Sequence, residues 1–276
     1  MRPLTATLSV LLLCSALGAQ QAASTGRVTI RNIAFNGLAP IPPADQERIV
    51  VAVQEHTYTR ESLPETSGRV RQQLQDRGYF KARVPAPTIT VVSNDSRGEL
   101  VDLELDVNLG QQYFLKQIVF TNNHVFTAGQ LRESFPLDDG AIFDTSKVRQ
   151  GLEDLRRKYT DRGYINFTSV PETVVDEPAA TIRLMIDLQE GAQYRAGALM
   201  LDGVEGVPGA AAKLHESWKQ YQGRVFNEAM IKSFMLENAA YLPQHKTDWQ
   251  LFDISQDSGI HVVNVRLQLG NAPTNR

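Results

Sequence analysis

Two segments of this chain share a helical pattern that ends in the sequence Arg-Gly-Tyr. The first segment runs from Thr59 to Val84 and the second from Asp144 to Phe167, and their glycines, Gly78 and Gly163, lie 85 positions apart. A glycine at the end of a helix can adopt the left-handed conformation that closes it. The repeat therefore predicts a series of similar small units rather than one large domain.

The starts of the two helices match as well as their ends. An aromatic residue precedes the expected N-cap, and an apolar residue follows the cap by four positions. In the first copy these residues are Tyr58 and Leu63. In the second they are Phe143 and Val148, on either side of the expected N-cap Asp144. Such a pair forms a hydrophobic staple, which fixes the direction from which the chain approaches the helix.

Each unit is predicted to contain a strand, two helices and two further strands. Two helices can cover only one face of a three-stranded sheet, so the expected fold is α+β, with three tandem two-layer domains of the order β-α-α-β-β. The predicted domains are residues 27–112, 113–193 and 194–270. The expected strands are residues 28–35, 82–92 and 100–107 in the first unit, 114–121, 165–175 and 181–188 in the second, and 198–201, 249–254 and 260–269 in the third.

The third unit departs from the other two. Pro243 is expected to end its second helix early, because proline interrupts helical hydrogen bonding. Lys246 and Thr247 occupy the positions at which the repeat places Gly-Tyr. Residues 271–276 are expected to form a disordered tail.

Residues 1–19 have the features of a signal peptide. Arg2 precedes an apolar run from Leu4 to Leu13, which is shorter than the about 20 residues that a membrane-spanning helix needs. The one cysteine, Cys14, lies in this peptide. Two interpretations stay open: an incidental residue, which we favour because Leu13 precedes it where lipidation sites carry small residues, or a lipid-modified residue. After cleavage at Ala19 the chain would contain no cysteine and no transmembrane segment.

Composition indicates a folded protein that needs no anionic partner. The chain is 42% hydrophobic and 21% charged with a net charge of −3, so nucleic acid is not an expected partner. The histidines lack metal-ligand spacing, and no nucleophile elbow, phosphate-binding loop or zinc-protease motif occurs. We therefore expect no catalytic residues, no metal site, no cofactor and no enzymatic activity.

The repeat length and the helix that ends in Gly-Tyr before a strand pair resemble POTRA (polypeptide-transport-associated) domains. The resemblance is strongest in the second unit. It rests there on Ile118-Val119-Phe120, Leu152 to Leu155, Tyr159, Gly163-Tyr164 and Glu190-Gly191. Such domains occur in tandem in the periplasm, ahead of the outer-membrane barrel of assembly proteins of the BamA and TamA kind. This chain stops at Arg276 without a barrel, which argues against an insertase activity of its own.

The resemblance implies peptide handling rather than chemistry, with the third strand central and the second at an edge. Prolines at positions 85, 87 and 171 independently favour edge strands, because proline cannot donate a ladder hydrogen bond. An extended peptide can pair with such an edge. The candidate pairing residues are Thr88, Ile89, Thr90, Val91 and Val92 in the first unit and Phe167, Thr168, Ser169 and Val170 in the second. Gly78, Tyr79, Gly163 and Tyr164 are expected to be structural, the glycines through their φ angles and the tyrosines through core packing.

These expectations favour a scaffold in the periplasm, alone or associated with the outer membrane. It would bind unfolded outer-membrane proteins or a barrel complex during assembly or transport. An alternative is a structural adaptor in a cell-envelope complex that binds no unfolded substrate. The chain could also be the detached amino-terminal part of a separately encoded barrel protein.

Overall fold

The computed structural model describes residues 27–96, 98–203, 209–242 and 251–269. The predicted signal peptide and tail lie outside these residues, as do Pro243, Lys246 and Thr247. Within the described residues no helix combines the length and the apolar character needed to cross a bilayer.

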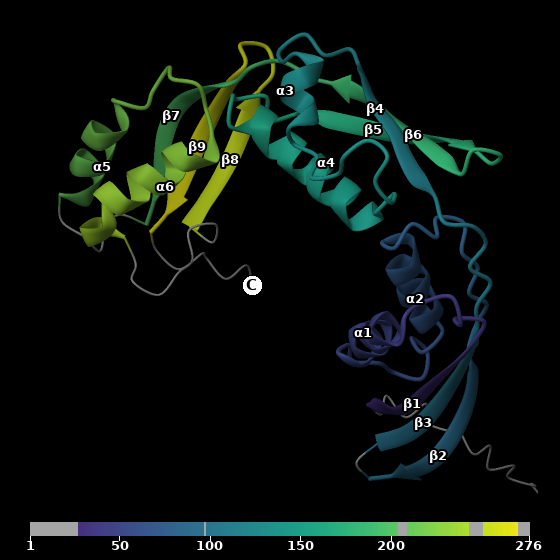
Figure 1. Ribbon diagram of the computed structural model, residues 1–276. Coiled ribbons are helices and arrows are strands. Elements are labelled where there is room, and N and C mark those ends of the chain that lie inside the picture. Colours follow the sequence, from purple (N-terminus) through teal and green to yellow (C-terminus); the bar gives the residue numbers. More distant parts are fainter. Residues whose placement is uncertain (1–26, 97, 204–208, 243–250, 270–276) are drawn as a thin grey trace, which may run out of the picture.

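The first unit is a three-stranded sheet covered by two helices on one face (Figure 1). Strand β3 lies between the other two strands, parallel to β1 and antiparallel to β2. In chain order the elements are β1 (Val28–Asn36), α1 (Pro43–Gln54), α2 (Glu65–Gln75), β2 (Thr88–Asp95) and β3 (Gly98–Asp106).

The second unit repeats this topology, with β6 between β4 and β5. Its first helix is reduced to little more than one turn, and its second is the longest helix of the described chain. The elements are β4 (Phe114–Thr121), α3 (Ala128–Arg132), α4 (Thr145–Thr160), β5 (Thr168–Asp176) and β6 (Thr181–Gln189).

The third unit has the same strand order, with β9 between β7 and β8. Its elements are β7 (Arg195–Asp202), α5 (Ala210–Trp218), α6 (Glu228–Glu237), the 3-10 turn η2 (Ala239–Tyr241), β8 (Phe252–Asp257) and β9 (Val262–Gln268). Figure 1 shows the three units following one another along a curved path. The predicted α+β fold of three tandem two-layer units is confirmed.

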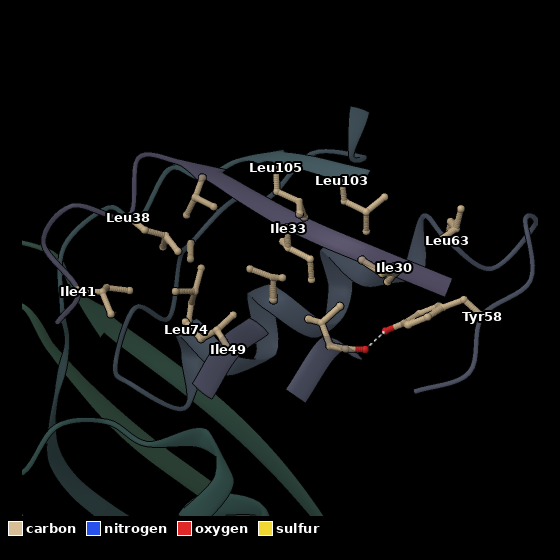
Figure 2. Close-up of a cluster of buried hydrophobic side chains, with 14 of the residues drawn as sticks. Ile30, Ile33, Leu38, Ile41, Ile49, Tyr58, Leu63, Leu74, Leu103 and Leu105 are labelled. Carbon is tan, nitrogen blue, oxygen red and sulfur yellow. Dashed lines mark hydrogen bonds between the residues drawn. The ribbon is translucent and has the colours of Figure 1, made fainter. Parts of the chain in front are cut away.

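Each unit has its own hydrophobic core between its helices and its sheet. Figure 2 shows the first core, in which strand side chains meet side chains from both helices and from the loop between them. The phenolic hydroxyl of Tyr58 donates a 2.9 Å hydrogen bond to the carbonyl oxygen of Val53, so this buried polar group is satisfied. The core side chains labelled in Figure 2 are Ile30, Ile33, Leu38, Ile41, Ile49, Tyr58, Leu63, Leu74, Leu103 and Leu105.

Both helices of the second unit begin with a side-chain cap, and the predicted N-cap Asp144 is present. The carboxylate of Asp144 accepts hydrogen bonds from the backbone N–H groups of Ser146 and Lys147, at 2.8 and 3.3 Å. Thr127 and Gln130 form a reciprocal capping box at α3. These contacts satisfy N–H groups that a helix leaves without internal partners.

Some predicted boundaries are wrong. Strands β2 and β5 begin later than expected, at Thr88 and Thr168 rather than at residues 82 and 165. The apolar residues after each helix-ending glycine imitate a strand pattern, but they lie in turns and irregular chain, and Phe80 and Ile165 pack against the core of the following unit. Helix α2 begins only after Pro64, as expected for a proline in the first turns.

Candidate functional site: free sheet edges and interdomain junctions

Strands β2, β5 and β8 are edge strands. Each lies at one end of its three-stranded sheet, beside the central strand. The edge position implied for the second strand of a unit is therefore present in all three units. The opposite edges, β1, β4 and β7, are each engaged by an isolated bridge to a loop: Val28 with Tyr58, Phe114 with Ile142, and Arg195 with Val225. Strands β2, β5 and β8 are thus the better candidates for pairing with another chain.

The β2 edge contains all five pairing residues predicted in the first unit. Thr88 and Thr90 are exposed, and Ile89 packs partly against the core. Val91 faces Val101 of β3, whereas Val92 falls at a register shift and has no opposing residue. Prolines 85 and 87 precede the strand instead of lying in it. The bulge at Val92 divides the edge, so the stretch before it offers the more regular ladder.

The β5 edge contains Thr168, Ser169 and Val170, but not Phe167. The ring of Phe167 is buried and stacks on Tyr159 with centroids 4.0 Å apart, and its backbone N–H donates to the carbonyl of Tyr164. Placing Phe167 at the edge was therefore wrong, because its N–H is already used and its side chain belongs to the core. Pro171 does lie within the strand, opposite Ile186.

The outward faces beside these two edges differ in chemistry. Beside β2, the central strand carries Asp102, Glu104 and Asp106, and Arg31 forms an ion pair with Asp102. The hydrogen bond from Arg31 holds the pKa of Asp102 below its ordinary value. Beside β5 the central strand carries Arg183, Met185 and Asp187 on the corresponding face, and Val170 and Val174 of β5 are 53% and 50% exposed.

The β8 edge was not among the predicted pairing residues. It carries no proline, which was the signal used for the other two edges, and the expected strand was placed a few residues early, at 249–254. All of its residues except Phe252 are exposed. The repeat itself could have located this edge, because the second strand of each unit occupies the same position in the sheet.

The helix-ending glycines form the junctions between units. The φ angles of Gly78 and Gly163 are +84° and +83°, the left-handed conformation expected from the sequence. The carbonyl oxygen of Gly78 accepts a 2.8 Å hydrogen bond from the N–H of Tyr113, the last residue before β4. The carbonyl of Gly163 accepts the same bond from Tyr194, before β7. The glycine thus closes its helix and also holds the first residues of the next unit.

A glutamine completes each junction. The side-chain amide of Gln112 donates to the carbonyl of Arg77 at 2.8 Å, and that of Gln193 donates to the carbonyl of Arg162 at 2.9 Å. Both acceptors are helix-end carbonyls that lack an internal partner. The sequence pattern did not predict this function of the glutamines.

The tyrosines of the Gly-Tyr pairs are less buried than expected. Tyr79 and Tyr164 are partly buried and pack at the margins of their cores. The fully buried tyrosines are Tyr58, Tyr113 and Tyr159. Phe80 and Ile165 each lie two residues after the glycine, and they pack against the core of the following unit. Phe80 makes an edge-to-face contact with Phe143, with centroids 5.5 Å apart.

The first junction also carries a charged cluster around Glu177, in the turn between β5 and β6. Its carboxylate accepts hydrogen bonds from the ammonium of Lys81, the hydroxyl of Tyr113 and the amide of Gln111. The hydrogen bonds from Lys81 and then Tyr113 lower the pKa of Glu177, and the reverse effect raises the pKa of Lys81. A second ion pair joins Arg149 to Asp76 at 3.0 Å. In the described part of the chain no group of three or more His, Cys, Asp or Glu side chains is arranged to hold a metal ion.

The chain is similar in sequence to assembly factors of the outer membrane. It is 25% identical over 149 residues to the "Putative outer membrane protein assembly factor" of Treponema pallidum, a match that covers 54% of this chain and 18% of the relative. It is 21% identical over 162 residues to "Outer membrane protein assembly factor BamA" of Neisseria meningitidis, covering 54% of this chain and 19% of the relative. The match therefore spans less than a fifth of either relative's length.

The fold is similar to that of a solved fragment, described as Haemophilus influenzae BamA POTRA3-5. The TM-score is 0.60 at 17% identity, over 90% of this chain and 98% of that fragment. The sequence pattern of the POTRA family, described as "Surface antigen variable number repeat", matches residues 28–110 and 113–191, which is more than half of the chain. These matches coincide with the first two sheet-and-helix units, and the chain belongs to the POTRA family.

Proposed function

We propose that the chain is a periplasmic scaffold in outer-membrane protein assembly or transport, and that it binds extended segments by β-augmentation at β2 and β5. The observation that carries the proposal is the edge position of these strands, which pair with the central strand alone among the described strands of a tandem POTRA chain. The names of the Treponema and Neisseria relatives, both outer membrane protein assembly factors, support the assembly process as its context. The proposed partners are unfolded outer-membrane proteins or a barrel complex, and the proposed role is binding without catalysis.

Edge pairing suits a scaffold that must accept many sequences. The ladder hydrogen bonds come from the peptide backbone, so they form whatever side chains the incoming strand carries. β2 and β5 are 8 and 9 residues long, enough for several ladder bonds. The acidic outward face beside β2 and the mixed one beside β5 would then bias the two edges toward different strands.

The test uses proline substitutions at edge positions whose backbone N–H points away from the central strand, in the chain expected after removal of residues 1–19. Val91→Pro in β2 and Ser169→Pro in β5 each remove such a donor and obstruct pairing with an incoming strand. The matched control is Ala86→Pro, since Ala86 is exposed and lies between two prolines outside any strand. Binding of an amphipathic strand peptide and of its scrambled version is measured by fluorescence anisotropy.

The proposal predicts that both peptides bind with similar affinity. It also predicts that the double edge variant loses about tenfold or more in affinity, whereas Ala86→Pro does not. Binding that is unchanged in the double edge variant would contradict edge pairing. A single defined envelope protein that binds equally well to the edge variants would instead favour the structural adaptor.

A further inference from the structure

A cavity of about 530 Å³ lies between the first and second units, beside the first junction. Its apolar lining comes from both units: Ile41 and Pro42 at the start of α1, Tyr79 after α2, and Ala141 and Ile142 ahead of α4. The volume falls within the range of pockets that bind small molecules or anchor side chains. The cavity does not overlap the sheet edges.

The cavity leaves apolar surface in contact with water. Ile142 is 41% exposed, although its neighbour Phe143 is buried. One methyl group of Ile142 lies only 2.6 Å from the position that a Cβ atom on Gly78 would occupy, so this side chain is packed against the junction on one side. Covering its other side with an apolar group would be favourable, because burial of apolar surface stabilises a complex.

Two carboxylates at the rim of the cavity have cationic partners within the chain. Asp45 forms an ion pair with Arg77, at 3.6 Å. Asp76 forms one with Arg149, at 3.0 Å. Because these carboxylates are already paired, they would offer little attraction to a cationic ligand.

The remaining two charged groups at the rim are Asp144 and Lys147. Asp144 uses its carboxylate to cap α4. The ammonium of Lys147 has no hydrogen-bond or ion-pair partner among the described residues, and the side chain is exposed. Lys147 is therefore the one charged lining residue whose charged group has neither a hydrogen bond nor an ion pair among the described residues.

We propose that this cavity binds a large apolar side chain followed or preceded by a carboxylate, carried by an extended segment of a partner protein. The apolar side chain would occupy the floor and the carboxylate would contact Lys147. The lining contains both apolar and charged groups. That mixture suits an apolar side chain carried beside a carboxylate, whereas a fatty acyl chain would leave the charged groups facing apolar surface.

An occupant of this cavity would touch both units at once. It would bind the docked arrangement of the first junction better than an undocked one, and so shift the junction toward the docked state. This site is independent of edge pairing, since none of its lining residues belongs to β2, β5 or β8.

The experiment uses a fluorescein-labelled acidic hexapeptide with one central tryptophan, together with two matched peptides. In one the tryptophan is replaced by serine, and in the other the acidic residues are replaced by lysine. Anisotropy titrations of the chain should show saturable binding of the first peptide and at least about tenfold weaker binding of the other two. Failure of the first peptide to saturate, or equal binding of all three, would overturn the proposal.

Two variants locate the binding. Lys147→Glu should weaken binding of the acidic peptide about fivefold and improve binding of the basic one. The matched control, Lys213→Glu, reverses an exposed charge on α5 and should change neither. Ile142→Asp should abolish binding of the acidic peptide, with circular dichroism to verify folding.

The Val91→Pro and Ser169→Pro variants separate this site from edge pairing. Binding of the acidic tryptophan peptide should survive in both. Its loss in the edge variants, or its persistence in Lys147→Glu at wild-type affinity, would overturn the cavity assignment whatever the outcome for β-augmentation.

Discussion

The two interdomain junctions share one backbone arrangement and differ in the side chains around it. In both, a left-handed glycine accepts the N–H of the tyrosine that begins the next unit, and a glutamine covers the neighbouring carbonyl. The first junction adds ion pairs from Lys81 to Glu177 and from Arg149 to Asp76. The second adds hydrogen bonds from neutral amides, those of Asn166 to the hydroxyl of Tyr194 and of Asn227 to a backbone carbonyl.

The shared backbone bonds and the differing side-chain contacts have different effects. The backbone bonds set the position of the next unit, and the side-chain contacts set how a junction responds to salt and pH. The shared backbone bonds are short-range and directional, so they fix where the next unit starts. Exposed ion pairs are weakened by salt, and carboxylates lose their charge in acid. We therefore expect the first junction to respond to salt and pH more than the second, where the attraction of Arg156 by Glu228 is a minor contribution.

The largest expected effect comes from the helix-ending glycine of the second junction. In Gly163→Ala the new Cβ would lie 2.8 Å from the carbonyl oxygen of Tyr194 and 2.7 Å from a methyl group of Val225, at a φ of +83°. Both the strained φ and the clash oppose docking, so we expect a loss of about 3 kcal/mol in the free energy of unfolding, measured by urea titration.

Two other glycines serve as controls for this substitution. Gly140 has the same φ of +83° but nothing within 4 Å of its Cβ position, so Gly140→Ala isolates the backbone cost, about 1 kcal/mol. In Gly78→Ala the nearest backbone atom is farther away, at 3.1 Å, and the closest contact is a methyl group of Ile142. The loss in the free energy of unfolding for Gly78→Ala should fall between the losses for Gly163→Ala and Gly140→Ala. Equal losses for Gly163→Ala and Gly140→Ala would show that the junction contact contributes nothing.

The sequence predicts the glycines well because their conformation is a local property. A helical pattern followed by Gly-Tyr is sufficient to indicate a left-handed C-cap at Gly163. That the same residue receives a hydrogen bond from Tyr194 depends on where the next unit sits, which no local pattern contains. The strand order was likewise implied by the POTRA resemblance and not by the residues of any one strand.

The errors at the sheet edges have a related cause. Alternating apolar residues indicate an extended chain but do not show where pairing begins. Phe167 fitted the pattern of the edge, yet it packs on Tyr159 because the chain reaches the sheet only at Thr168. The sequence could not predict the cavity beside Ile142. Its lining comes from two units, and the repeat pattern does not show how two units pack against each other.

The next largest effect should come from the apolar side chains that cross each junction. Phe80→Ala removes the contact with Phe143, and Ile165→Ala removes the corresponding contact with the third core. Because both side chains are half-buried, we expect losses of about 2 and about 1.5 kcal/mol, respectively. Neither loss should depend on salt, since apolar contacts are not screened; urea titrations at low and high sodium chloride test this.

The smallest effect, and the one most specific to the first junction, comes from Glu177. Hydrogen bonding to Lys81 lowers the pKa of Glu177 in the docked state from its ordinary 4.5. The carboxylate therefore stabilises the docked junction above pH 4.5, and this stabilisation is lost as the pH falls through the docked pKa. The pKa of Lys81 is raised above 10.5, so its contribution is present below 10.5 and is lost as the pH rises through the docked value. The cluster is therefore complete between these limits.

Spin labels can measure this difference directly, because the only cysteine lies in the predicted signal peptide. Labels at Gln72→Cys and Gln150→Cys report the first junction, and labels at Gln150→Cys and Lys213→Cys report the second. We expect the first distance distribution to broaden modestly as the pH falls below 4.5 and in Glu177→Gln at neutral pH, with less acid broadening in that variant, which keeps the Asp76–Arg149 ion pair. The amides of Asn166 and Asn227 do not titrate in acid, so the second distribution should stay narrow. Equal acid broadening at both junctions would show that the Glu177 cluster does not distinguish them.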